Sequence, residues 1–141
     1  MDFKISNVYL SFKTSGDTDI IDITPHVSRS VSESGLTEGQ VLIFVPGSTA
    51  AITTIEYESG AVRDLKEAIE RLAPAGIPYR HDARWGDGNG YAHVRAALLG
   101  PSLTVPLIQG RLILGTWQQI VMVDFDNEPR DRKVLVSSSG S

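Results

Sequence analysis

The sequence predicts an α+β fold, a sandwich of mainly antiparallel sheet that carries about three helices. Two observations favour this class. Segments typical of β-strands outnumber those typical of helices, and the helices do not alternate regularly with strands as they would around a parallel, doubly wound sheet. The length of 141 residues suits one hydrophobic core. We expect a single domain over residues 1–136, followed by a flexible Ser-Ser-Ser-Gly-Ser tail over residues 137–141 that lies outside the fold.

The expected strands are short. Residues 8–12 alternate between the two faces of a strand, and residues 41–45 form a continuous apolar run typical of a strand buried on both faces. Gln109-Gly110 is typical of a tight hairpin turn. The remaining strands are expected at residues 19–24, 48–57, 103–108, 111–114, 119–126 and 133–136.

The helices are indicated by periodicity and by their end signals. Thr24-Pro25 resembles an N-cap followed by proline at the first helical position, which predicts a short helix ending near Gly35. A polar loop over residues 79–90 is expected to lead into a short helix over residues 91–99. An amphipathic helix before Pro74 is marked by apolar residues at helical spacing, namely Val62, Leu65, Ile69 and Leu72.

Composition excludes several classes of function. A net charge of -4 argues against broad binding to nucleic acid or to an anionic membrane, because both need a basic face. The absence of cysteine excludes disulfides and zinc–thiolate sites. The chain begins without a secretion signal and has no apolar run near the roughly 20 residues that span a bilayer. We therefore expect a cytoplasmic protein, and we expect no organic cofactor.

Two of the three histidines could share a metal site. Imidazole and carboxylate ligands together suit a divalent metal ion, although the spacing matches no named zinc motif. The candidate ligands are His81, His93, Asp82, Asp87 and Glu56. The alternative is that these side chains only stabilise loops through hydrogen bonds. Because the glycine-rich residues 86–90 can reverse the chain, we expect the imidazoles of His81 and His93 to converge to within about 10 Å, whereas His26 is expected to be structural.

Four further features have both a structural and a functional interpretation. Asp87-Gly88-Asn89-Gly90 can form a turn or present polar groups to a ligand. Gly47-Ser48-Thr49 can bind a phosphate, but it is shorter than a P-loop and lacks the lysine. Arg95 can contact an anion or form a surface salt bridge. Trp117 can pack in the core or offer a stacking surface.

Six motifs along the chain together resemble a known family. They are Gly47-Ser48-Thr49-Ala50-Ala51, Ile55-Glu56, Tyr79-Arg80-His81-Asp82, Asp87-Gly88-Asn89-Gly90, residues 97–106 and Leu114-Gly115-Thr116-Trp117-Gln118-Gln119-Ile120. In this order they resemble the YjbQ family, described as secondary thiamine-phosphate synthase enzymes. The resemblance runs from about Phe3 to Val136 and so covers nearly the whole domain.

The resemblance implies a compact α+β sandwich that assembles as a homotrimer, with polar pockets near the subunit boundaries. It also implies thiamine-phosphate synthesis as a weak or side activity. In that reaction a thiazole nitrogen attacks the methylene carbon of a pyrimidine diphosphate, and pyrophosphate leaves. Such chemistry favours a divalent cation (Mg, Mn or Zn) on the leaving group, donors for phosphate oxygens and a flat surface for the heterocycle.

This chain departs from the family pattern at two positions. Many members have a histidine where Gly47 stands, and a His-x-His pair where Tyr91-Ala92-His93 stands. A cluster of four histidines is thereby reduced to His81 and His93. Tyrosine, with an ordinary pKa of about 10, is a poor zinc ligand at neutral pH. If Tyr91 fills the place of an imidazole, Tyr91→His should strengthen metal binding.

The leading hypothesis is a trimeric enzyme that acts on a small phosphorylated ligand. The proposed catalytic residues are His81, His93, Glu56, Asp87 and Asn89, with His81 and His93 as metal ligands. The candidate contacts to substrate and phosphate are Ser48, Thr49, Arg95, Thr116, Trp117 and Gln118. The rival hypothesis is a non-catalytic trimeric module that binds a metal ion or a small anion.

Overall fold

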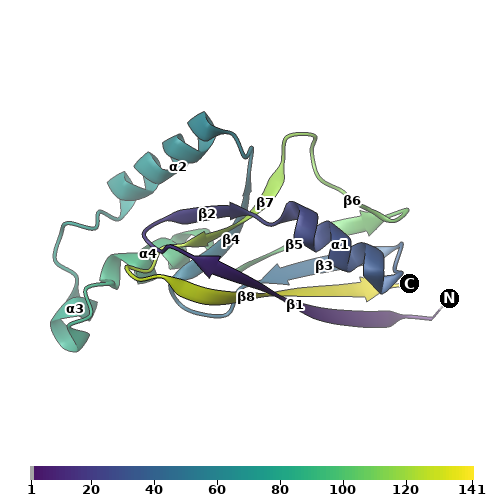
Figure 1. The fold of residues 1–141 in the computed structure, drawn as a ribbon, viewed down its shortest axis with the longest axis horizontal. Helices are drawn as coiled ribbons and strands as arrows, with labels where there is room; N and C mark the ends of the chain where they lie inside the picture. Colours follow the sequence, from purple (N-terminus) through teal and green to yellow (C-terminus); the bar gives the residue numbers. More distant parts are fainter. Residues whose placement is uncertain (1) are drawn as a thin grey trace.

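A computed structural model describes residues 2–141 and confirms the α+β class (Figure 1). The neighbouring strands of this part of the chain pair antiparallel. The described residues contain four helices, where about three were expected. In chain order the elements are β1 (Lys4–Thr14), β2 (Asp19–Asp22), α1 (Thr24–Ser34), β3 (Gly39–Phe44), β4 (Ala50–Ile55), α2 (Ser59–Leu72), α3 (Arg80–Trp85), α4 (Gly90–Leu99), β5 (Ser102–Ile108), β6 (Arg111–Leu112), β7 (Gln119–Asp124) and β8 (Arg130–Gly140).

The strands form two sheets. One has five strands in the order β1-β8-β3-β5-β6, and the other has three strands in the order β2-β7-β4. β1 and β8 run side by side along the molecule, so that the two chain ends lie at the same end of the five-stranded sheet (Figure 1). The hairpin between β5 and β6 is confirmed, because Ile108 pairs with Arg111 and both Gln109 (φ 51°) and Gly110 (φ 76°) are left-handed.

The expectation of a flexible tail over residues 137–141 is wrong. Residues 137–140 continue β8, which lies between β1 and β3. Ser137 pairs with Asn7 on one side and with Leu42 on the other, and Ser138 is only 2% exposed. A serine run carries no apolar pattern, and its order here comes from backbone hydrogen bonds to two neighbouring strands.

Two apolar clusters hold the layers together. The first lies between the two sheets and α1, and it includes Val27, Ile43 and Met122. The second lies on the other side of the three-stranded sheet, where it packs against α2 and α4. β7 is therefore the strand buried on both faces. The same expectation for residues 41–45 is wrong, because Leu42 is 38% exposed.

The predicted helices occur, with shifted ends. α1 begins at Thr24 and its N-cap is Ile23, so Thr24 is not the cap. The Thr24 hydroxyl instead accepts a hydrogen bond from the Ile120 backbone N–H at 2.8 Å, which ties α1 to β7. The helix ends at Gly35, as expected, with a left-handed φ of 74°. α2 buries Ile69 against the second cluster and contains the amphipathic segment predicted from periodicity.

Candidate functional site

An open cleft of about 530 Å³ lies where three loops meet at one end of the three-stranded sheet. Ser48 and Thr49 come from the β3–β4 loop, and the helices α3 and α4 bring two histidines. The segment after β7 contributes acids and arginines. The residues that line the cleft are Gly47, Ser48, Thr49, His81, Trp85, Asp87, Asn89, His93, Asp126, Arg130, Asp131 and Arg132.

The segment from residue 79 to residue 90 was expected to be a loop, but it contains the helix α3. Gly86, with a left-handed φ of 74°, ends this helix and lets the chain turn towards α4. The turn places the rings of His81 and His93 with centroids 4.3 Å apart and planes tilted by 37°. The predicted convergence of the two imidazoles is therefore confirmed.

His81 lies between two carboxylates. Its Nδ1 is 3.4 Å from Asp82 Oδ1 and 3.3 Å from Asp87 Oδ1. Asp82 Oδ1 also accepts the Gly90 backbone N–H at 2.8 Å, which fixes the start of α4 against α3. Among residues 2–141, the metal-ligating atoms that gather within 4.8 Å of one another belong to these three residues, and His93 is not one of them.

The spacing of this group fits a divalent cation. Ligand atoms around a tetrahedral zinc ion, at bonds of 2.0–2.1 Å, lie about 3.3–3.4 Å apart. The distances from His81 Nδ1 to the two carboxylate oxygens have these values. The Asn89 amide lies nearby, between the carboxylates of Asp126 and Asp87: Nδ2 donates to Asp126 Oδ1 at 3.3 Å, or in the flipped orientation to Asp87 Oδ1 at 3.1 Å.

Two buried aspartates lie at the floor of the cleft, where Asp126 lines it and Asp124 lies beneath it, paired with the lining residue Arg132. Asp124 is 0% exposed, and its carboxylate accepts hydrogen bonds from Nε and Nη2 of Arg132, both at 2.9 Å. Asp126 Oδ2 accepts from Arg130 Nε at 2.8 Å. Burial acts to raise the pKa of each carboxyl, but hydrogen bonds outweigh burial and leave each pKa below its ordinary value, mainly through Arg132 for Asp124 and through Asn89 and Arg130 for Asp126. Both floor residues therefore stay charged.

Arg132 is held so that one of its nitrogens faces the cleft. Nε and Nη2 bind Asp124, and Nη2 also donates to Thr49 Oγ1 at 2.6 Å. Nη1 makes no hydrogen bond within residues 2–141 and is not buried. It lies beside Gly47, where an added Cβ would approach it to 2.9 Å. The missing side chain at position 47 thus leaves room for a guanidinium donor at the cleft wall.

Two expected site residues face away from the cleft. Arg95 is 3% exposed, and its guanidinium donates to the Ala73 carbonyl, to Thr18 and to the exposed Glu70. Tyr91 is 5% exposed, and its hydroxyl donates to Asp17 Oδ1 at 3.2 Å. Arg95 is therefore not a phosphate contact, and Tyr91 does not fill the place of a metal-binding imidazole.

Four other candidates do not line the cleft. Glu56 is exposed just beyond the end of β4. Thr116, Trp117 and Gln118 lie in the turn before β7, where Gln118 Nε2 donates to Thr54 Oγ1 at 3.2 Å. Trp117 is 69% exposed, so the core-packing interpretation of this residue is wrong. Trp85, which is 66% exposed, is the indole that lines the cleft.

The residues that sequence reasoning missed come mainly from the end of β7, the loop that follows it and the start of β8. Asp124 and Asp126, and Arg130 and Arg132, are each two positions apart, which is the spacing that places side chains on one face of a strand. That repeat was the available signal. It resembles an ordinary solvated hairpin end unless the burial of the aspartates is known.

Comparison with known proteins identifies the family. Residues 8–141 match the family described as UPF0047 protein YjbQ-like. The chain belongs to this family. A UPF0047 protein from Archaeoglobus fulgidus is 43% identical over 129 residues, which cover 92% of this chain and 98% of that protein. UPF0047 protein YugU from Bacillus subtilis is 38% identical, with 93% and 97% covered.

Solved structures of other members of the YjbQ-like UPF0047 family share the fold. A YbjQ-like protein of unknown function from Sulfolobus solfataricus superimposes with a TM-score of 0.94 at 32% identity, covering 99% of this chain and all (100%) of that one. A family member from Clostridium acetobutylicum gives a TM-score of 0.85 at 39% identity, with 93% and 98% covered. These relatives are described without a reaction, so membership establishes the fold and not an activity. Among residues 2–141, no helix is long and apolar enough to cross a bilayer.

Proposed function

We propose that the cleft binds a divalent cation and, next to it, a small phosphorylated ligand. The observation that carries this proposal is the arrangement of His81 between Asp82 and Asp87, at separations suited to a shared ion. His81, Asp82 and Asp87 would hold the cation. Imidazole with carboxylate suits zinc or manganese, and a site richer in carboxylate and water suits magnesium.

The net charge of the cleft favours a cation as the first ligand to bind, followed by an anion. The carboxylates in or beneath the cleft outnumber the guanidinium groups: they are Asp82, Asp87, Asp124, Asp126 and Asp131, against Arg130 and Arg132. A phosphate dianion entering alone would meet net negative charge, whereas a bound cation would reverse the local balance. We therefore expect phosphate binding to depend on the metal ion.

Residues on the opposite side of the cleft would bind and orient the ligand. The Nη1 of Arg132 and the hydroxyl of Ser48 lie next to Gly47 and are donors for phosphate oxygens. Asp124 and Thr49 hold the Arg132 guanidinium in place before the ligand arrives. The Trp85 indole and the paired rings of His81 and His93 are flat surfaces against which a heterocycle can lie.

The reaction proposed for this arrangement is a transfer of the thiamine-phosphate synthase type. The ring nitrogen of a thiazole phosphate forms a bond to the methylene carbon of a pyrimidine diphosphate, the carbon–oxygen bond breaks, and pyrophosphate leaves with the bonding electrons. A bound cation would stabilise charge on that leaving group. The protein residues would align the two heterocycles, and Arg132 would neutralise phosphate oxygens.

A second candidate is a module that binds the metal and the anion without catalysis. It is favoured by the ion pairs of Arg130 with Asp126 and of Arg132 with Asp124, which already neutralise much of the positive charge at the cleft. A departing pyrophosphate commonly requires more positive charge than this. Activity measurements separate the two candidates.

The test combines titration with an assay of pyrophosphate release, on protein prepared without an affinity tag. His81→Ala should weaken Mn²⁺ and Zn²⁺ binding by at least tenfold, because it removes one ligand of the proposed set. His26→Ala is the matched control, since His26 is exposed on α1 and packs against Phe12. Equal metal affinity in the wild type and His81→Ala would contradict the cation site.

Phosphate should bind measurably only when Mn²⁺ is present. Pyrophosphate released from a pyrimidine diphosphate and a thiazole phosphate by the wild type, and not by His81→Ala, would support the transferase. Metal-dependent phosphate binding without any pyrophosphate release would favour the binding module.

A further inference from the structure

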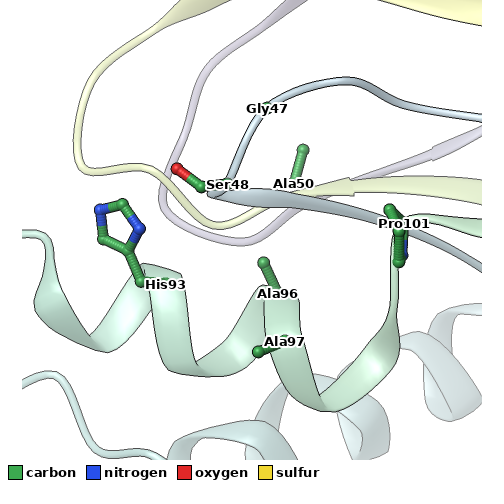
Figure 2. A pocket seen from close by; sticks show the side chains of 7 residues that line it. All are labelled: Gly47, Ser48, Ala50, His93, Ala96, Ala97 and Pro101. Atoms are coloured by element: carbon green, nitrogen blue, oxygen red, sulfur yellow. The ribbon is translucent and has the colours of Figure 1, made fainter.

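A second cavity, of about 270 Å³, opens beside the cleft (Figure 2). Its lining is made of small and mostly apolar residues: Gly47, Ser48, Ala50, His93, Ala96, Ala97 and Pro101. We call it the alanine pocket. Three of its residues, Gly47, Ser48 and His93, also line the cleft, so the two spaces are continuous at that end.

Close packing explains part of this lining but not the cavity itself. Ala96, at 6% exposure, lets α4 approach β4 closely, as alanines do at a helix–sheet contact. Ala97 is exposed, and a larger side chain there would meet no such limit. Helix–sheet packing therefore does not require alanine at position 97.

The pocket is polar at one end and apolar at the other. In Figure 2 the Ser48 hydroxyl and the His93 imidazole lie together at one end, and Ala96, Ala97 and Pro101 follow along α4 towards the other. The Arg132 Nη1 lies beside Gly47, at the boundary with the cleft. A ligand that crosses this boundary meets charged groups on the cleft side, then Ser48 and His93, and then hydrocarbon at the far end of the pocket.

We propose that the alanine pocket is the subsite for a single compact apolar ring, carried by a ligand whose phosphate group lies in the cleft. This inference rests on the proposed function, because it assumes that the phosphate lies next to Arg132 and the cation. It adds a place for one ring of such a ligand, an aromatic or heteroaromatic ring joined to phosphate through a link of one or two bonds. Ser48 and His93 lie where that link passes, so they are positioned to bind polar atoms near it.

The experiment compares two ligands that differ only in the ring. Inorganic phosphate and phenyl phosphate are titrated, with Mn²⁺ present, into the wild type, Ala97→Leu and Val94→Leu. Ala97→Leu fills the pocket, while Val94→Leu adds a methylene group on the same helix at an exposed position outside both cavities. Leucine is a strong helix former, so both variants should keep α4 intact. Phenol alone is tested in parallel by the chemical shifts of the Ala96 and Ala97 methyl groups.

In the wild type and in Val94→Leu, phenyl phosphate should bind roughly tenfold more tightly than inorganic phosphate, because a ring buried from water adds affinity. Ala97→Leu should remove this difference and leave the affinity for inorganic phosphate unchanged. Phenol should shift the two methyl resonances in the wild type and not the remaining Ala96 methyl in Ala97→Leu.

Equal affinities for the two phosphates in the wild type, or an advantage of phenyl phosphate that survives in Ala97→Leu, would overturn the pocket assignment while leaving the phosphate site intact. Failure of both phosphates to bind, while phenol still shifts the methyl groups, would overturn the proposed function and the link to phosphate, and would leave an apolar ring site. Failure of both phosphates and of phenol would overturn the pocket assignment as well.

Discussion

Arg132 and Asp124 form a bidentate ion pair beneath the cleft, with Nε to Oδ2 and Nη2 to Oδ1 both at 2.9 Å. Asp124 is 0% exposed, and Arg132 is the residue that neutralises it at closest range. A buried carboxylate without its partner is strongly destabilising. The pair therefore links the stability of the fold to the orientation of the Arg132 nitrogen that faces the cleft.

Arg132→Lys should lower the free energy of unfolding by about 2–4 kcal/mol, because an ammonium group cannot reproduce the two parallel hydrogen bonds. Urea unfolding at pH 7 measures the change. Lys133→Arg is the control at the neighbouring exposed position, and it should leave the midpoint unchanged. Equal midpoints for the wild type and Arg132→Lys would mean that the pair adds no stability.

Much of the fold was predictable because its signals are local. The amphipathic repeat of α2 and the left-handed pair Gln109-Gly110 both appear where the pattern placed them. Order in residues 137–140 was not predictable, since it depends on two partner strands far away in the sequence. α3 was missed because it is only six residues long and buries no side chain of its own.

The site was predictable only in part, for a geometric reason. Residues two positions apart on a helix point about 200° apart, because each residue turns the helix by about 100°. Tyr91 and His93 are both in α4, so His93 faces the cleft and Tyr91 faces the second apolar cluster. Side chains at positions 91 and 93 could face the same site if they were on a strand, where residues two apart share a face. On a helix they cannot.

Alkaline pH should destabilise the protein through Tyr91. Burial, and then the nearby Asp17, raise the pKa of its hydroxyl to about 12. The folded state thus favours the neutral phenol. Its contribution to the free energy of unfolding is complete below pH 10, the ordinary pKa, and is lost as the pH rises towards 12. Between pH 9 and pH 11.5, the loss attributable to this group should be about 2 kcal/mol.

Urea unfolding of the wild type and Tyr91→Phe at these two pH values measures this loss. The variant should lose less stability than the wild type on the change to high pH, because phenylalanine does not ionise. Tyr9→Phe is the control, since Tyr9 is 62% exposed and should behave as the wild type does. A parallel decline of all three proteins would remove Tyr91 as the cause.

A homotrimer is expected in solution, as the family resemblance implies. β1 is an edge strand of eleven residues that exposes Ile5 and Tyr9, each at 62%. Long apolar edges of this kind invite association, and a closed ring of copies covers them without open-ended growth. Light scattering at physiological salt should give about three times the chain mass of 15.3 kDa. A monomer across micromolar concentrations would exclude the trimer.

Gly47→Ala should both strain the backbone and disturb Arg132. Gly47 has a φ of 118°, which side chains other than glycine rarely adopt, and an added Cβ would lie 2.9 Å from Arg132 Nη1. The strain should lower the free energy of unfolding by about 1–3 kcal/mol.

Displacement of Nη1 should weaken Mn²⁺-dependent phosphate binding while leaving Mn²⁺ affinity itself unchanged, because His81 and its two carboxylates lie on the other helix–loop segment. Gly76→Ala is the control, since an added Cβ there meets nothing within 4 Å. If Gly47→Ala matched Gly76→Ala in both stability and phosphate affinity, neither the strained backbone nor the Arg132 donor would matter to the cleft.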